Sequence, residues 1–587
     1  MRIKNYMENM GNMLNRMKIS KKNSLITVLL NVLSILGGIL FILIDLHPFF
    51  WNIIGIIMLV TLVWNLFFTF LSVNLVNTQD KSGKYLNIFG IFYFLFVIIS
   101  ISGIMLSNLL ISVRYSNDNL LFYGIIYGFY FAVYSFGASM GFLGLQTRNR
   151  VQLWQKEAQK PSEKKRLGKI GRIIFTLFLF LSFLGGVYCG FAATFGAFFD
   201  IIFVPTALAG QFGIFFSVIL LANTFLLLRM HWARKKQKRY KVIGLLGVMS
   251  SSLLLIPLIA TPGAQFSASR NFSNAFGNDW QEKIPENVEE EYFLQSPFTI
   301  PQYLLGVSPA DCKIGKNITF YQNEDLTLNY DVYFPKEEPT NLPGNGSILI
   351  RLHGGGWIMN NKGAGSMLQM NKYFAAQGYV VFDVQYAQYD MELGFRLPNT
   401  PEYLLGDYTI DEIVASVGYF TKYIANHTNE YDGDVTTQEP DMNLNSVFVS
   451  GGSAGGHLTG ALGWRISSEK YTDHFGNNLT IKGLIPFYPA NRMMRWFGIE
   501  VKDKNLANPE NLIDSNSPPC LIYQGTHDIL HWFHIPESIK ENYENAGRKD
   551  CAIIWIPCGG HASDIYFNGY YNLLFLYFIE RFIYIYR

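Results

Sequence analysis

The sequence predicts two unlike parts: an α-helical multi-pass membrane region and, after it, an α/β domain whose mostly parallel sheet is covered by helices. Long apolar runs fill residues 24–260. The charge changes sign at the same place, because residues 1–260 hold 25 Lys and Arg against 7 Asp and Glu, whereas the remainder holds 22 against 37. Beyond residue 313, short apolar strands alternate with helical segments, as in a parallel sheet covered on both faces.

The membrane region follows a basic tail, residues 1–23, and is expected to hold about seven helices. Each apolar run is near the ~20 residues that cross a bilayer core. The expected spans are residues 24–46, 50–76, 85–113, 120–145, 173–199, 201–228 and 242–260. The first run is too long for a removable signal peptide and has no small-residue cleavage site after it, so we interpret it as a retained anchor.

The placement of charge predicts the orientation of these helices. All but one of the 25 basic residues lie in the N-terminal tail or in the connections near residue 80, at 148–172 and at 229–241. By the positive-inside rule the N-terminus is cytoplasmic, and an odd number of helices places the second domain outside the cytoplasm, with the plasma membrane as the expected location.

The expected partners of this basic region are membrane lipids and not nucleic acid, because no aromatic-basic surface motif accompanies the charge. Ionisable side chains in mid-span usually mark a function, and none lies there. Anchoring is therefore the simplest role, while lipid binding, transport or sensing stay open.

Residues 261–312 are expected to form a juxtamembrane linker, because they lose apolar continuity and gain Ser, Asn, Pro and acidic residues.

The second domain is expected at residues 313–587, opening with an antiparallel hairpin that turns at Asn323. Later strands are expected at residues 348–352, 379–382, 446–449, 483–485, 520–523 and 552–556. The aromatic run 570–586 is expected to form a helix on the sheet, with contact to the membrane surface as the alternative. Cys520 and Cys551 each open a strand; neighbouring buried thiols are favoured over a disulfide.

The chemistry centres on Gly451-Gly-Ser-Ala-Gly-Gly, which follows a buried strand and precedes a helix. That context gives a G-x-S-x-G match its meaning, because Ser453 would lie on a sharp strand-to-helix turn. The glycines let the strand and helix approach closely. A serine hydroxyl is a weak nucleophile, so it needs a base and an acid that orients the base.

Both partners occur in a fitting order and at strand ends. Asp528 follows the strand that begins at Cys520, and His561 lies in a Gly-rich loop after the last strand. The predicted oxyanion hole is formed by the N–H groups of Gly355 and Gly356, in His353-Gly-Gly-Gly-Trp, together with that of Ala454.

These motifs resemble the hormone-sensitive-lipase-like group of α/β-hydrolases, and particularly its carboxylesterase and feruloyl/acetyl-xylan-esterase-like branch. The resemblance covers about residues 317–587, and implies an α/β-hydrolase fold, Ser453 as nucleophile, Asp528 as acid, His561 as base and no metal. The segment Asp383-Val-Gln-Tyr departs from the Asp-Tyr-Arg-Leu common in that group, which affects the shape of the pocket and not the triad.

Other histidines compete for a role. His457 lies four residues after Ser453, where packing or a local hydrogen bond is favoured. The spacing of His527, His531 and His534 could suit zinc on a helix. We expect no metal and no other cofactor, because the triad already accounts for the chemistry.

The sequence therefore predicts a membrane-anchored serine carboxylesterase acting on a small-molecule, lipid or glycan ester. The alternative is a membrane receptor, transport or assembly protein whose hydrolase domain binds a ligand without turnover. Peptidase chemistry is a weaker third hypothesis, since no access-limiting domain is present in the sequence.

Overall fold

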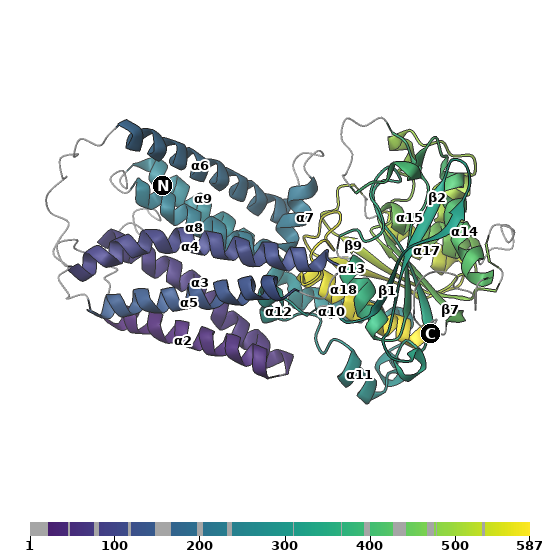
Figure 1. The fold of residues 1–587 in the computed structure, drawn as a ribbon, viewed down its shortest axis with the longest axis horizontal. Coiled ribbons are helices and arrows are strands. Elements are labelled where there is room, and N and C mark those ends of the chain that lie inside the picture. Colours follow the sequence, from purple (N-terminus) through teal and green to yellow (C-terminus); the bar gives the residue numbers. More distant parts are fainter. Residues whose placement is uncertain are drawn as a thin grey trace.

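The fold was analysed in a computed structural model of the full chain. It describes residues 21–44, 47–75, 81–115, 119–146, 166–196, 203–231, 237–308, 310–365, 367–391, 399–426, 442–466, 475–476, 478–530 and 534–587. Two parts lie end to end, a bundle of long helices and a sheet domain (Figure 1).

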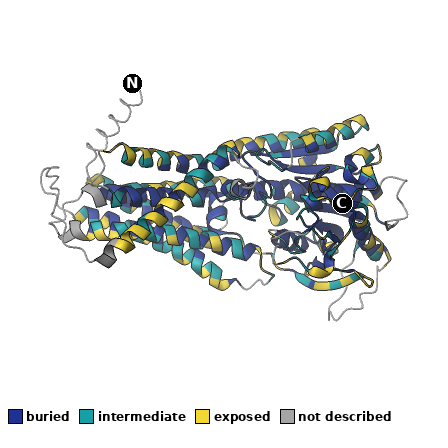
Figure 2. Ribbon diagram, turned by 90° about the horizontal axis from the view of Figure 1, so that it is seen from above, coloured by how far each residue is buried: buried dark blue, intermediate teal, exposed yellow. Residues whose placement is uncertain are grey.

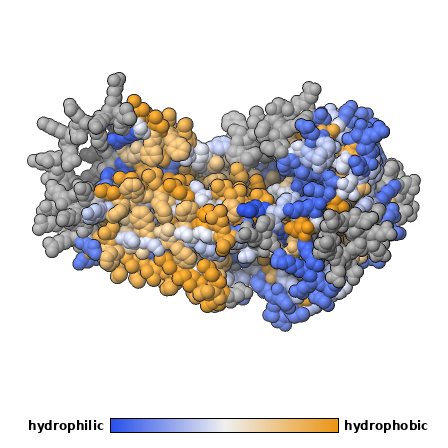
Figure 3. Space-filling model, in the orientation of Figure 1, coloured by the Kyte–Doolittle hydropathy of each residue, from blue (hydrophilic) through white to orange (hydrophobic). Residues whose placement is uncertain are grey.

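The N-terminal part is a bundle of long helices, which we call the helical region. Its helices are α2 (Lys21–Leu43), α3 (Pro48–Leu75), α4 (Lys81–Ser112), α5 (Leu120–Gln146), α6 (Arg166–Phe195), α7 (Phe203–Gln211), α8 (Gly213–Met230), α9 (Lys238–Leu253) and α10 (Ile256–Phe276). Within the described residues, seven helical stretches are long and apolar enough to cross a membrane, as the sequence predicted. Their outer surface is hydrophobic, in contrast to that of the sheet domain (Figure 3).

Two of the expected spans differ from the observed helices. The sixth span was expected at residues 201–228, but α7 ends at Gln211 and the long helix α8 begins at Gly213. The seventh is interrupted at Leu254 and Leu255, just before Pro257, whose missing N–H cannot continue the helical hydrogen-bond pattern.

The segment expected as a linker is largely helical. Helix α10 continues to Phe276 and is followed by α11 (Glu286–Tyr292) and α12 (Ile300–Leu305). The apolar pattern weakens after Ala260 because only one face of α10 is buried there, through residues spaced about four apart such as Ala264, Ala268 and Phe272.

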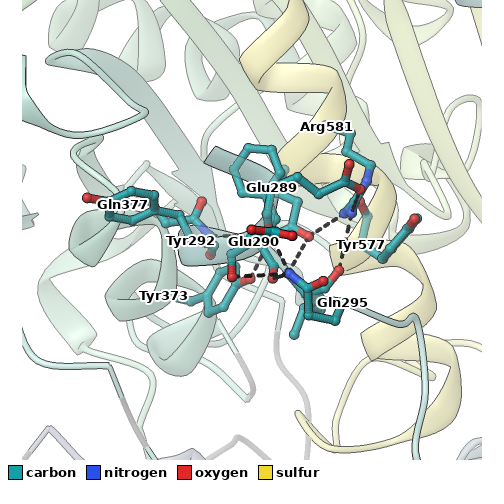
Figure 4. A network of polar contacts seen from close by, with 11 residues as sticks. Glu289, Glu290, Tyr292, Gln295, Tyr373, Gln377, Tyr577 and Arg581 are labelled. Carbon is teal, nitrogen blue, oxygen red and sulfur yellow. Dashed lines mark hydrogen bonds and ion pairs between the residues drawn. The ribbon is translucent and has the colours of Figure 1, made fainter. Parts of the chain in front are cut away.

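A polar network fastens this segment to the sheet domain (Figure 4). Buried Arg581 donates hydrogen bonds to Glu289 Oε1 at 2.5 Å and to Glu580 Oε1 at 2.6 Å. Glu580 also accepts the N–H of Leu294 and the hydroxyl of Tyr373. Burial raises the pKa of Glu580 to about 7, although Arg581 opposes that shift. The segment before the sheet domain is therefore packed in place.

The second part contains an eight-stranded sheet in the order β1-β2-β4-β3-β7-β8-β9-β10. The strands are β1 (Lys313–Gln322), β2 (Thr327–Phe334), β3 (Ser347–Leu352), β4 (Val380–Val384), β7 (Asn443–Gly452), β8 (Ile481–Phe487), β9 (Cys520–Gly525) and β10 (Cys551–Ile556). Strand β2 is antiparallel to β1 and to β4, and all other pairs are parallel. The predicted hairpin and mostly parallel sheet are confirmed. A small second sheet pairs β5 (Gln388–Tyr389) with β6 (Leu405–Gly406).

Helices cover both faces of the large sheet. They are α13 (Met367–Ala376), α14 (Ile410–Asn426), α15 (Ala454–Ile466), α16 (Lys504–Ala507), α17 (His534–Asn545) and α18 (Tyr570–Tyr586). The aromatic run 570–586 packs on the sheet as predicted, since Phe575 contacts Phe487 edge-on at 4.7 Å. One apolar core covers the α18 face of the sheet and continues into the helical region, and a second covers the opposite face. Figure 2 shows buried residues running through both parts without interruption.

Cys520 and Cys551 are register partners at the start of β9 and β10. Both are buried and free, as favoured from the sequence. Burial raises the pKa of the Cys520 thiol, so this side chain behaves as a small apolar group in the core.

Candidate active site

Ser453 lies at the sharp turn between β7 and α15, with a φ of 57°. This left-handed conformation is strained for a residue with a side chain. Hydrogen bonds on both sides hold it, because the Ser453 N–H donates to Phe487 O at 3.0 Å and its carbonyl accepts the N–H of Ala490 at 3.1 Å. The turn therefore presents the hydroxyl at the end of the sheet.

The glycines around Ser453 are required by close backbone contacts. A Cβ built on Gly455 would be 2.1 Å from Leu352 O, and one on Gly451 would be 2.5 Å from the same oxygen. The helix that follows the serine thus lies directly against the end of β3. No larger residue fits at Gly455 without moving the backbone.

The structure brings together the three residues predicted as a triad. His561 Nε2 lies 3.1 Å from Ser453 Oγ, and His561 Nδ1 lies 3.0 Å from Asp528 Oδ2. Asp528 and His561 are 6% and 7% exposed. The other carboxylate oxygen of Asp528 accepts the N–H of Leu530 at 3.0 Å, which fixes its orientation.

These contacts arise from the sheet topology. Ser453 follows β7, Asp528 follows β9 and His561 follows β10, and all three strands are parallel members of the same sheet. Their carboxyl ends meet at one edge, so residues more than a hundred positions apart become neighbours. An imidazole placed between a hydroxyl and a carboxylate can take the hydroxyl proton while the carboxylate stabilises the imidazolium.

The loop predicted to supply oxyanion donors lies beside the serine. A Cβ on Gly354 would be 3.3 Å from Ser453 Cβ. Gly355 and Gly356 have φ values of 131° and 63°, which favour glycine. Within the part of the chain that the structure describes, their N–H groups have no hydrogen-bond acceptor. Ala454 is the first residue of α15, so its N–H has no partner inside the helix.

Buried polar residues that the sequence did not single out lie next to His561. The ring of Tyr488 packs edge-on against the imidazole at 4.7 Å, and its hydroxyl donates to Asp564 Oδ1 at 2.5 Å. Burial raises the pKa of Asp564. Tyr488 directly follows β8 and Asp564 lies three residues after His561, so only these positions in the sequence could have drawn attention to them.

None of the other histidines in the described part of the chain is hydrogen-bonded to Ser453 Oγ. The His457 ring is buried, and its Nε2 contacts Leu506 O at 2.6 Å, which agrees with the expected local hydrogen bond. His527 lies beside the backbone of Ala193, and His534 begins α17. His531, the middle member of the spacing that could suit zinc, lies outside the described residues.

Comparisons with known proteins find distant structural similarity. No family model and no curated protein matches the chain. The apo form of Thermogutta terrifontis esterase 2 is 19% identical, with a TM-score of 0.34, over 47% of this chain and 91% of the esterase. Esterase B from Lactobacillus rhamnosis is 17% identical, with a TM-score of 0.31, over 44% of this chain and 81% of the esterase. This distant similarity assigns no residue roles in this chain.

Proposed function

We infer that this chain is a membrane-anchored serine hydrolase that cleaves carboxylic esters. The observation that carries the proposal is the continuous contact from Asp528 through His561 to Ser453, beside a loop in which the N–H groups of Gly355 and Gly356 have no acceptor among the described residues. Each of the three side chains lies where acyl transfer through a serine requires it. The predicted α/β-hydrolase family and its triad agree with this arrangement.

In the proposed reaction, Ser453 Oγ attacks the ester carbonyl while His561 Nε2 takes the hydroxyl proton. The carbonyl oxygen becomes an oxyanion, which accepts hydrogen bonds from the N–H groups of Gly355, Gly356 and Ala454. His561 then gives the proton to the departing alcohol, leaving an acyl-serine. Water, deprotonated by His561, attacks the acyl-serine, and the acid and free Ser453 result. Asp528 keeps Nδ1 protonated throughout and stabilises the imidazolium.

The seven long apolar helices support placement in a membrane. With the N-terminus in the cytoplasm, the sheet domain lies outside it, as the distribution of basic residues predicts. Small-molecule, lipid and glycan esters are all available to an enzyme at that surface.

The test is the activity of the purified full-length protein toward p-nitrophenyl acetate or butyrate. We expect Ser453→Ala to lower turnover by at least about 10⁴-fold, because the remaining groups cannot form the acyl-serine. The matched control is Ser538→Ala on α17, whose hydroxyl contacts Arg492 at the surface and which should keep full activity.

Retention of turnover by Ser453→Ala would contradict the assignment. A second outcome would favour the alternative of a membrane receptor, transport or assembly protein. In that outcome the folded, unchanged protein hydrolyses none of a panel of acyl esters but binds one of them.

A further inference from the structure

The loops that hold the acid and the base both rest on the helical region. His527, the residue before Asp528, lies beside the backbone of Ala193 near the end of α6. Gly210 of α7 lies against the loop of His561. A Cβ built on Gly210 would be only 3.2 Å from the carbonyl oxygen of Cys558 in that loop. The ends of α6 and α7 therefore contact both sides of the proposed site.

The loop that carries the oxyanion donors meets a third helix end. Gly363 lies against Tyr115, because a Cβ built on Gly363 would be 2.7 Å from the Tyr115 hydroxyl oxygen. Tyr115 follows α4, and its hydroxyl donates a hydrogen bond to Asp331 at 2.8 Å. Lys372 donates to the carbonyl of Tyr115 at 2.5 Å and to that of Arg114 at 3.2 Å. The edge of the sheet that bears Ser453 thus faces the end of the helical bundle, as Figure 1 shows for α4 and α7.

Aromatic packing fixes this orientation. Tyr566, five residues after His561, stacks on Phe212 with ring centroids 4.7 Å apart. The hydroxyl of Tyr566 donates to Tyr303 O, and the hydroxyl of Tyr303 donates to Gln211 O, each at 2.7 Å. The contact is therefore part of the folded core, and the site is held toward the helices.

The sheet domain also lies close to the apolar outer surface of the bundle. On α10, Phe266 is 72% exposed, while Asn271 donates a hydrogen bond to Ile553 O in β10 at 2.9 Å. Five residues of helix span about 7–8 Å at 1.5 Å per residue. No spacer separates the domain from the surface that a bilayer would cover.

Helix α6 has an exposed apolar face that extends to the helix end nearest the loop of Asp528. Its outward side chains from Ile170 to Leu184 are largely exposed, and so is Phe195, at 64%. Phe195 lies two residues after Ala193, which contacts the loop of Asp528. An acyl chain lying along α6 in the outer leaflet would therefore end beside the proposed site.

We propose that the outer ends of α4, α6 and α7 form the entrance to the site of Ser453, and that the ester it cleaves belongs to an amphiphile of the outer leaflet. This inference rests on the proposed hydrolase function and adds a substrate class to it. The helical region is then part of the site as well as an anchor. An ester at the headgroup level reaches Ser453 while its chain stays among the lipids.

The experiment uses the full-length protein in vesicles of palmitoyl-oleoyl-phosphatidylcholine. Two substrates share one leaving group: 4-methylumbelliferyl oleate, held in the bilayer, and 4-methylumbelliferyl acetate, dissolved in water. The variant is Phe195→Ser, and the matched control is Phe178→Ser, which changes an equally exposed phenylalanine (66%) toward the other end of α6.

We expect Phe195→Ser to lower kcat/KM for the oleate by at least about fivefold while changing that for the acetate by less than about twofold. Phe178→Ser should leave both within about twofold. Labelling by two fluorophosphonates in the vesicles gives a second measurement. Phe195→Ser should slow labelling by a hexadecyl fluorophosphonate more than labelling by a water-soluble ethyl fluorophosphonate, and Phe178→Ser should change neither rate. Phe195→Ala serves as the milder variant if Phe195→Ser does not fold.

The inference would be overturned if the two variants changed kcat/KM for the oleate equally. It would also be overturned if Phe195→Ser lowered kcat/KM for the oleate and the acetate by the same factor. Hydrolysis of the acetate without the oleate by the unchanged protein would overturn it and leave the proposed function intact. Hydrolysis of neither ester would refute both.

Discussion

His457 and His561 both lie near the nucleophile, but the fold gives them different surroundings. The His561 ring contacts the hydroxyl of Ser453 on one side and the carboxylate of Asp528 on the other. His457 is enclosed in the core, where Nε2 contacts a carbonyl oxygen and Nδ1 has no hydrogen-bond partner among the described residues. Burial lowers the pKa of His457 to about 4.

This depressed pKa predicts a loss of stability on acidification. The unfolded chain takes up a proton at His457 as the pH falls below about 6.5, whereas the folded protein does so only near pH 4. Between these values the unfolded state binds more protons, so stability falls as the pH falls. For this one residue the loss from pH 7 to pH 5 is roughly 2 kcal/mol.

The measurement compares the fall in Tm of the unchanged protein and of His457→Gln between pH 7 and pH 5. The unchanged protein should show the larger fall. The difference isolates His457 from other buried groups such as Glu580, whose raised pKa acts in the opposite direction. Equal falls would show that His457 is not held neutral by the fold.

Individual site residues differ in how well the sequence predicts them. Ser453, Asp528 and His561 each have a local signal, because short motifs place them directly after apolar strands. Tyr488 and Asp564 have no such signal. Their contact joins the ends of two strands and exists only once the sheet has formed.

At the scale of elements, the β7–α15 turn depends on the close approach of α15 to β3. Gly455→Ala would place a Cβ 2.1 Å from Leu352 O and 2.6 Å from His353 O. Both contacts are with backbone, so α15 or the loop of the oxyanion donors must shift. A misplacement of about 1 Å can cost about 100-fold in rate, and we expect kcat to fall by at least that factor.

The control for this substitution is Gly263→Ala on α10, where a Cβ meets nothing within 4 Å. There alanine should stabilise the helix by about 0.5–1 kcal/mol. The two variants are compared by kcat and by Tm. Normal activity of Gly455→Ala would show that the turn is less constrained than its geometry indicates.

Most elements were predictable from local patterns, and the exceptions have physical causes. The hairpin, the parallel strands and the seven apolar stretches follow from alternation, apolar runs and helix length. The interruption before Pro257 and the end of α7 at Gln211 lie inside continuous apolar runs, where hydropathy carries no signal for a break. The helical course of residues 261–276 depends on tertiary packing against β10.

At the scale of the whole molecule, the helical region and the sheet domain share one apolar core. The sequence predicted two parts and their order, but not their contact. That contact uses scattered residues such as Tyr115, Ala193 and Phe212, which lie at helix ends and belong to no motif. The result is that loops of the candidate active site pack against the ends of the helices.

The identity of the reactive serine tests the central claim most directly. Full-length protein labelled with a fluorophosphonate is digested, and the modified residue is located by peptide mass spectrometry. Ser450 is an internal control, because it lies three residues earlier, within β7, and its hydroxyl accepts a hydrogen bond from Arg351. We expect a single adduct on Ser453. A folded protein that carries the adduct on another residue, or takes up none, would contradict it.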